Sequence, residues 1–246
     1  MKVLAVALLC RIVMLATPMS AQRPVDSART IGIAPIVVTA GALAAAFTVD
    51  AIIARHVEGS TTTETLGTAR QLDRFGDVTG MAPIIGGLAV LGIVAHDRSL
   101  TRTAALALGS VATATVVTQA TKYVVGRVRP YADPDRDGSD LRFFAGSPSF
   151  PSGHTAAAFA LATSLGDATG HTWARIGFYV LATGTGWARI TEQAHWLSDV
   201  VAGAAVGIAS AKWASGRLRI FGLLAPRIMV GHNGSGLAWT VPIPGP

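Results

Sequence analysis

Long apolar segments rich in alanine and glycine run through most of this 246-residue chain and limit what it can fold into. Half of the residues are hydrophobic and only 14% are charged, whereas about 25% are charged in an ordinary soluble domain. The small residues suit close packing of one helix on another. We therefore expect an all-α fold, a polytopic bundle of about six apolar core helices. The segments lie at roughly 31–49, 81–95, 103–121, 155–166, 176–187 and 197–214.

The two ends of the chain differ from this core. Residues 1–21 resemble a secretory signal peptide, but Arg11 interrupts the apolar run, so an uncleaved N-terminal anchor is the alternative. Residues 22–219 are expected to form one helical domain, in which the polar stretch 55–79 predicts an interfacial or extramembrane helix. Glycine and proline break the tail, 220–246, where two short extended stretches predict a β-hairpin.

Charge and cysteine content exclude several classes of protein. The formal net charge of +6 comes from 20 lysines and arginines, which are spread thinly rather than gathered on one basic face, so we expect no nucleic-acid partner. Membrane proteins are commonly basic through their cytoplasmic loops, which accounts for the charge. The single cysteine, Cys10, allows neither an internal disulfide nor a thiolate metal site.

Three polar clusters interrupt the apolar pattern, each at the end of a segment, where ionisable groups are usually retained for a task. In the first cluster, Lys122 and Arg129 are seven residues apart, so both cations project from nearly one helix face before Pro130 ends the helix. Together they can hold the oxygens of a phosphoryl group. Two interfacial cations reaching toward lipid headgroups would have the same spacing.

The second cluster places Ser152, Gly153 and His154 at the start of an apolar helix. Unpaired backbone N–H groups and the helix dipole favour an anion there. His154 at the mouth of such a site can protonate a leaving alkoxide. A plain serine cap followed by an incidental histidine is the alternative.

In the third cluster His195 and Asp199 are four residues apart, so on a helix one lies above the other. A carboxylate bonded to one imidazole nitrogen leaves the other nitrogen as a nucleophile. Arg189, six residues earlier, supplies another cation for a phosphate. A buried histidine–aspartate pair with only a structural role fits the same spacing.

Metal binding is a poor interpretation of these clusters, because Lys122, Arg129 and Arg189 would repel a divalent cation. We therefore expect no metal and no cofactor. The other histidines lie in polar connections or in the tail without comparable neighbours, and we expect them to be solvated. They are His56, His96, His171 and His232.

In order and spacing, the clusters resemble the three-part signature of the type 2 phosphatidic acid phosphatase superfamily, which includes bacterial class A acid phosphatases and vanadium haloperoxidases. That signature is Lys, six residues, Arg-Pro; then Pro-Ser-Gly-His; then Ser-Arg, five residues, His, three residues, Asp. The chain matches it at 122–130, 151–154 and 189–199. The chain departs from the signature at one position, where Ala188 stands in place of the serine before Arg189. The resemblance covers about 81–214.

The resemblance implies a phosphatase in which His195 attacks phosphorus and forms a phosphohistidine. Asp199 would orient and stabilise the imidazole, and His154 would protonate the leaving oxygen and later activate water. The implied phosphate-binding residues are Lys122, Arg129, Ser152, Gly153 and Arg189. The implied substrate is a lipid phosphate or diphosphate: phosphatidate, phosphatidylglycerol phosphate or polyprenyl diphosphate.

Basic residues in the connections favour one orientation, since cytoplasmic loops are enriched in lysine and arginine. We expect a bacterial inner-membrane protein whose active site faces the periplasm. A cleaved signal followed by six full spans would instead carry the site to the cytoplasm. Three alternatives avoid this conflict: residues 31–49 do not cross the membrane, residues 1–21 are not removed, or the protein is soluble in the periplasm. The basic residues are Arg98, Arg102, Arg175, Lys212, Arg217 and Arg219.

Three other functions fit the same residues. One is a soluble periplasmic acid phosphatase of broad specificity, another is a vanadate-dependent haloperoxidase, and the third is a membrane scaffold with an inactive phosphatase site. The 131–150 loop carries mixed charges and the adjacent aromatics Phe143 and Phe144, and we expect it to gate substrate access.

Overall fold

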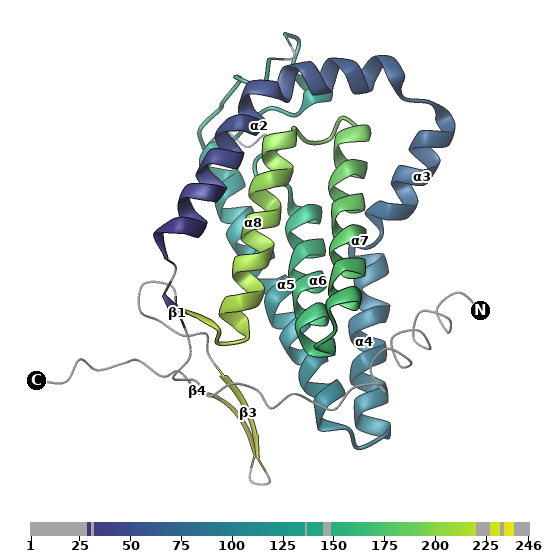
Figure 1. The fold of residues 1–246 in the computed structure, drawn as a ribbon, viewed down its shortest axis with the longest axis vertical. Helices are drawn as coiled ribbons and strands as arrows, with labels where there is room; N and C mark the ends of the chain where they lie inside the picture. Colours follow the sequence, from purple (N-terminus) through teal and green to yellow (C-terminus); the bar gives the residue numbers. More distant parts are fainter. Residues whose placement is uncertain are drawn as a thin grey trace, which may run out of the picture.

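A computed structural model describes residues 29–30, 32–135, 137–144, 149–219, 227–231 and 234–238. The predicted signal peptide or anchor at 1–21 lies outside these residues. Within them the fold is an all-α helical bundle, as the sequence predicted (Figure 1). Its α-helices are α2 (Ile33–Ser60), α3 (Thr63–Asp73), α4 (Val78–Val94), α5 (Arg98–Val125), α6 (Gly153–Thr169), α7 (Thr172–Thr191) and α8 (Leu197–Ala214).

Each of the six predicted apolar segments falls in a separate helix of this set. The first helix is longer than expected, because α2 continues past Asp50 to Ser60 instead of ending with its apolar run. Asp50 therefore lies inside α2, where it is buried. The polar stretch after it contains the last turns of α2 and all of α3.

Local side-chain chemistry explains several of the helix ends. Thr62, Asp77 and Asp97 accept hydrogen bonds from backbone N–H groups at the starts of α3, α4 and α5. Gly126 ends α5 in the left-handed conformation, with φ of 59°. A side chain there would collide with the backbone carbonyl of Arg142, so this glycine lets the following loop fold back over the end of α5.

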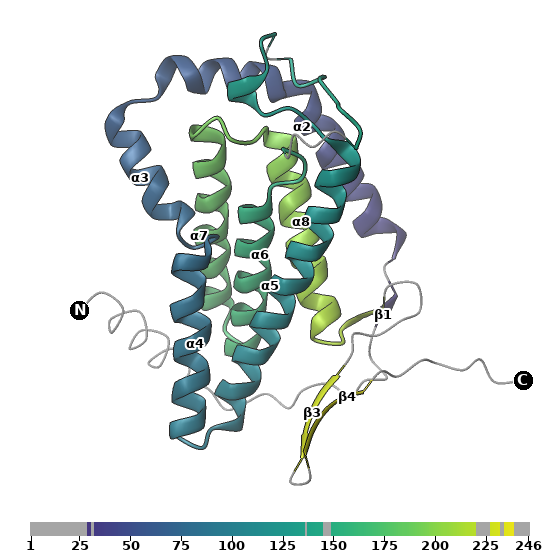
Figure 2. The same cartoon turned by 180° about the vertical axis from the view of Figure 1, so that it is seen from behind.

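Helix α6 is the centre of the bundle, packed against α5, α7 and α8 (Figures 1 and 2). Its buried side chains are mostly alanine and threonine, which lets neighbouring backbones approach closely. Larger apolar residues on α4 and α6, including Met81, Leu88, Leu161 and Leu165, complete the core. Helix α2 lies at the edge of the bundle against α8.

Three stretches are long and apolar enough to cross a membrane: Ile33–Ser60, Thr63–Val94 (α3 together with α4) and Arg98–Val125. Many of their large apolar side chains are exposed, among them Val38, Ile93 and Val116. A surface of this kind is expected to face lipid.

The two ends of the bundle differ in what they carry. The end where α7 turns into α8 also holds the end of α2 and the segment after α5, while the α4–α5 turn lies at the opposite end (Figures 1 and 2). Two short strands, β1 (Arg29–Thr30) and β2 (Leu218–Arg219), pair in parallel at the lower end of α8, again opposite the α7–α8 turn. The predicted tail hairpin is present as β3 (Arg227–Gly231) and β4 (Gly234–Ala238).

Candidate active site

The three predicted clusters meet at the end of the bundle where α7 turns into α8. Lys122 lies in the last turn of α5, and Arg129 immediately precedes a short 3₁₀ turn, η2 (Pro130–Ala132). Helix α6 begins at Gly153, and Arg189 lies in the last turn of α7. His195 lies in the connection to α8. Four helix ends thus gather residues as far apart in the sequence as Lys122 and His195, which are 73 positions apart.

The cations form one electrostatic group. The charges of Arg129, Arg189 and Asp199 all act on the ammonium group of Lys122. The Nε atoms of Arg129 and Arg189 are buried and have no hydrogen-bond partner among the described residues. Buried guanidinium donors without a partner are costly, so these two are suited to an anion that arrives from outside.

His195 and Asp199 form the buried pair that the spacing predicted. The Nδ1 atom of His195 lies 3.4 Å from Oδ2 of Asp199, and both side chains are almost completely buried. With Nδ1 facing the carboxylate, the Nε2 atom is the ring nitrogen left for chemistry.

Burial lowers the pKa of His195 to about 4, from an ordinary value of 6.5. The cations Lys122 and Arg189 act in the same direction, while Asp199 opposes the shift. The imidazole is therefore neutral near pH 7, and a neutral imidazole is the form with a free lone pair.

Asp199 is held at each of its oxygens. Its Oδ2 accepts hydrogen bonds from the backbone N–H of Trp196, at 2.9 Å, and from the hydroxyl of Ser149. Its Oδ1 accepts from Arg127 at 2.9 Å. The carboxylate therefore has a fixed orientation toward His195.

The start of α6 lies directly beside this pair. The backbone N–H of Ser152 donates to the backbone carbonyl of Asp199 at 2.9 Å. The hydroxyl of Ser152 caps the helix by accepting from Thr155. Among the described residues outside its own helix turn, only the Cε of Lys122 lies within 4 Å of where a Gly153 side chain would begin. The helix N-terminus is thus open toward the cations.

Acidic residues that the sequence did not single out surround His154. Its Nδ1 and Nε2 atoms lie 3.4 Å from Asp73 and 3.5 Å from Asp77. Asp73 also binds Arg189 at 3.1 Å, and Glu192 binds the same guanidinium group at 2.5 Å. The polar stretch at 55–79 therefore reaches into the site as well as forming a helix near its edge.

The turn between α3 and α4 brings these carboxylates in. A side chain at Gly76 would lie 2.4 Å from the backbone oxygen of His154, so the two backbones are in close contact. The hydroxyl of Thr185 also donates to the carbonyl of Leu72 at 2.9 Å. No sequence spacing within 55–79 indicates these tertiary contacts.

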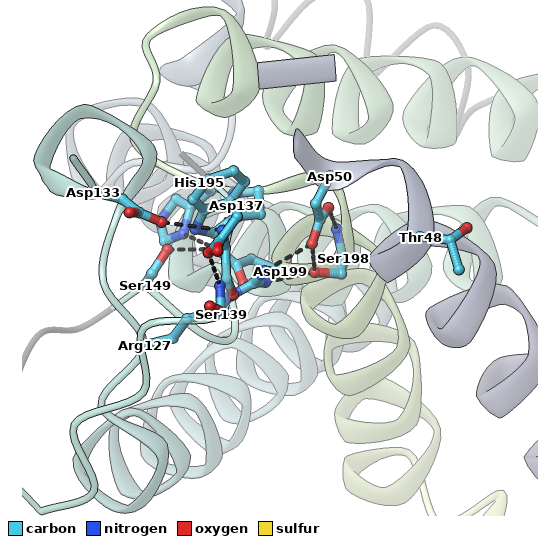
Figure 3. A network of polar contacts seen from close by, with 12 residues as sticks. Thr48, Asp50, Arg127, Asp133, Asp137, Ser139, Ser149, His195, Ser198 and Asp199 are labelled. Atoms are coloured by element: carbon cyan, nitrogen blue, oxygen red, sulfur yellow. Dashed lines mark hydrogen bonds and ion pairs between the residues drawn. The ribbon is translucent and has the colours of Figure 1, made fainter. Parts of the chain in front are cut away.

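A second set that the sequence did not single out lies behind the histidine–aspartate pair: Asp50, Arg127 and Ser198 (Figure 3). All three are buried. One signal was available, since Asp50 is the only charged residue between 33 and 54, and such residues usually have a buried task. Arg127 lies within the first signature motif, between Lys122 and Arg129. The motif assigns a role to those two cations and none to Arg127.

The structure also shows where Ala188 and the remaining histidines lie. Ala188, at the position of the signature serine, is fully buried. His56, His96 and His171 are exposed, as expected, and His232 lies outside the described residues. No three histidine, cysteine, aspartate or glutamate side chains are grouped to hold a metal within the described part of the chain.

Comparison with known proteins agrees with the signature. The family model of the PAP2 superfamily matches residues 103–219. A lipid A 1-phosphatase from Porphyromonas gingivalis is 34% identical over 139 residues, which is 55% of this chain. The alignment spans only 28% of the length of that relative.

Two solved structures share the fold. LpxE from Aquifex aeolicus has a TM-score of 0.54 at 22% identity, covering 68% of this chain and 94% of LpxE. A transmembrane PAP2-type phosphatidylglycerolphosphate phosphatase from Bacillus subtilis has a TM-score of 0.58 at 20% identity. That match covers 73% of this chain and 90% of the neighbour.

Proposed function

This chain belongs to the PAP2 superfamily, and on that premise we propose that it is a membrane phosphatase that hydrolyses a lipid phosphate through a phosphohistidine on His195. The observation that carries the proposal is the arrangement of three cations around a buried, neutral histidine with a fixed carboxylate behind it. Such a site binds a phosphoryl group and presents a nucleophile to it without needing a metal ion.

Lys122, Arg129 and Arg189 would hold the non-bridging oxygens of the phosphoryl group. The unpartnered Nε–H groups of the two arginines are available donors, and the N–H groups at the start of α6 add to them. Phosphoryl transfer depends mostly on positioning and on neutralising charge, which this arrangement supplies.

In the first step, Nε2 of His195 attacks phosphorus, so that a P–N bond forms while the P–O bond to the lipid breaks. The leaving oxygen takes a proton from His154. In the second step, His154 takes a proton from water, the resulting hydroxide attacks phosphorus, and the P–N bond breaks to release inorganic phosphate. Asp199 stabilises the positive charge that the imidazole bears while it carries the phosphoryl group.

A lipid substrate is favoured by the surface around the site. The long helices that could cross a membrane are mostly exposed, with 11%, 17% and 28% of their most apolar windows buried. A soluble protein would bury more of them. The candidate lipids are phosphatidate, phosphatidylglycerol phosphate and polyprenyl diphosphate, to which the named relative adds lipid A.

We further propose that the site faces the periplasm. The basic residues Arg98 and Arg175 lie in the first turns of α5 and α7, and Arg217 follows α8, all at the end of the bundle opposite the site. The positive-inside rule assigns this end to the cytoplasm. In this orientation residues 29–30 also lie on the cytoplasmic side, because they pair with residues 218–219.

Cysteine labelling tests this orientation. In a Cys10→Ser background, an impermeant maleimide added to spheroplasts is expected to label Asp137→Cys, on the site side. His96→Cys, in the α4–α5 turn, is expected to react only after lysis. The reverse pattern would place the site in the cytoplasm.

Phosphate release by detergent-purified protein tests the activity. The assay contains EDTA and offers phosphatidate, phosphatidylglycerol phosphate, polyprenyl diphosphate, lipid A and a small soluble phosphate ester in parallel. His195→Ala is expected to lose about 10⁴-fold or more in rate, while His171→Ala, at the opposite end of the bundle, keeps wild-type activity.

The substrate preference decides between lipid and soluble esters. Activity toward one lipid that survives EDTA supports the proposal. Equal activity on the soluble ester would favour a phosphatase of broad specificity. Folded wild-type protein with no activity on any substrate would favour a scaffold and refute the proposal.

A further inference from the structure

Arg127 is a buried arginine directly behind the His195–Asp199 pair (Figure 3). One terminal nitrogen donates to Oδ1 of Asp199 at 2.9 Å and to the hydroxyl of Ser198 at 2.6 Å. The other terminal nitrogen donates to Oδ2 of Asp50 at 2.8 Å. Arg127 therefore bridges two buried carboxylates, one of which faces the proposed nucleophile.

The rest of the Arg127 side chain is equally constrained. Its Nε donates to the backbone carbonyl of Gly138 at 2.9 Å. The rings of Phe47 and Trp196 lie 4.8 Å and 5.1 Å from its guanidinium carbon. Contacts of this kind fix a planar guanidinium in one orientation, which a flexible lysine could not reproduce.

Asp50 is the residue of α2 that completes the network. Besides binding Arg127, its carboxylate accepts from the backbone N–H of Ser198 at 2.9 Å and from the hydroxyl of the same residue. Ser198 lies in the first turn of α8, as does Asp199. Asp50 therefore joins α2 to the helix turn that carries the proposed catalytic carboxylate.

We propose that Asp50 and Arg127 are positioning residues for the reaction, an inference that rests on the proposed function. Arg127 occupies Oδ1 of Asp199, so the carboxylate cannot rotate and Oδ2 stays directed at His195. Asp50 balances the charge of Arg127, so the negative charge of Asp199 remains available to the imidazole when it becomes cationic.

The proposal gives α2 a part in the chemistry. None of the three signature motifs lies on this helix, and its exposed face is that of a helix in contact with lipid. Nevertheless, Asp50 on this helix binds Arg127, and Arg127 binds Asp199, the carboxylate that supports His195. Displacing α2 is therefore expected to lower the rate of phosphoryl transfer without removing any residue that contacts phosphate.

Steady-state kinetics of Asp50→Asn and Arg127→Lys test the proposal. Each variant is expected to lower kcat by about 10- to 100-fold, as loss of an orienting partner does in other sites. The KM for the lipid and the inhibition constant of inorganic phosphate should stay unchanged, because the phosphate-binding cations are untouched. Asp167→Asn, which removes a carboxylate from the opposite end of α6, is the matched control and should keep wild-type kcat.

Two results would overturn the proposal: a folded Asp50→Asn protein with wild-type kcat, or one whose inhibition constant for phosphate rises together with the loss of kcat. Should Asp50→Asn fail to fold, Ser198→Ala decides. It removes only the hydroxyl between Asp50 and Arg127, and it should lower kcat several-fold with phosphate inhibition unchanged. Wild-type kcat in folded Ser198→Ala would contradict the network's role.

The wild-type protein measured in the same assay separates this inference from the proposed function. If the wild type releases no phosphate, the proposed function fails before any variant is compared. If the wild type is active and the folded variants match it, only the positioning role fails.

Discussion

Helices α2 and α6 are both apolar and alanine-rich, yet they occupy opposite situations in the bundle. Most side chains of α6 are buried, whereas α2 buries Ala46, Asp50 and Ala54, a single stripe at four-residue spacing. The outward positions of α2 carry large side chains such as Ile36 and Val38. Apolar character thus indicates that a helix avoids water, but the size and spacing of its residues indicate whether protein or lipid surrounds it.

The comparison also separates two ways of serving a site. Helix α6 supplies His154 and an open N-terminus at the place where phosphate is proposed to bind. Helix α2 supplies one carboxylate, Asp50, which acts at a distance through Arg127. Variants on the two helices are therefore expected to have different kinds of effect.

The largest contrast is expected between two histidines. His154→Ala on α6 should lower kcat by about 10²- to 10⁴-fold, the usual contribution of a general acid or base. His56→Ala, near the end of α2, is an exposed matched control and should leave kcat unchanged. Phosphate release from the preferred lipid measures both. Equal losses of kcat in the two variants would contradict a catalytic role for His154.

A pair of glycine variants should change stability in opposite directions. In Gly207→Ala, on α8, the new methyl group would lie 2.3 Å from the backbone oxygen of Ala156 on α6. We expect a loss of about 1–3 kcal/mol. In Gly41→Ala, on α2, the methyl group meets no atom of another described element within 4 Å, so the better helix former should add about 0.5–1 kcal/mol.

Thermal unfolding in detergent measures both glycine variants, and the midpoint should fall for the first and rise for the second. A destabilised Gly41→Ala protein would show that the outer face of α2 packs against protein, such as a second copy of the chain.

A smaller effect should distinguish the stripe on α2 from its outer face. Ala54→Leu places a large side chain at a buried position beside Gln193, whose side-chain amide donates to the Ala54 carbonyl at 3.1 Å. It should cost about 1 kcal/mol or more through overpacking. Ala44→Leu is the same change at an exposed position of this helix and should be neutral. Equal thermal unfolding midpoints for the two variants would contradict the claim that only one stripe of α2 packs against protein.

The smallest expected effect is the absence of a titration. Because burial lowers the pKa of His195 to about 4, its ring should remain neutral from pH 7 down to about pH 5. The ¹⁵N spectrum of histidine-labelled protein measures this, with His195→Gln used to assign the signal. A midpoint near 6.5 would show that the ring is solvated.

The depressed pKa of His195 also predicts that the free energy of unfolding falls as pH drops from 6.5 toward 4, since the unfolded state then binds the extra proton.

Much of this arrangement could be predicted from residue patterns. Apolar segments separated by polar connections predicted every major helix, because burial away from water depends on composition over many residues. The residues at 122–130, 151–154 and 189–199 were predicted to form one site, and the structure brings them together. The resemblance to the phosphatase superfamily carried that prediction. Helix spacing alone was not sufficient, because α5 ends at Val125, before Arg129, and α8 begins at Leu197, after His195.

The parts that could not be predicted depend on tertiary contacts. The predicted apolar segment ends at residue 49, although the helix continues and Asp50 lies within it with Arg127 as its partner, 77 positions away. Asp73 and Asp77 were assigned to an interfacial helix, although the turn after α3 directs them at His154. No periodicity indicates a partner that far along the chain.

The central claim, that His195 carries the phosphoryl group, is tested most directly by trapping the intermediate. A lipid substrate labelled with ³²P in the transferred phosphate is mixed with enzyme, quenched in alkali within milliseconds and analysed by peptide mapping. The account predicts a label that is stable in base, labile in acid and located on the peptide containing His195, and no label in His195→Ala. A label on another residue, or an active enzyme that never becomes labelled, would contradict it.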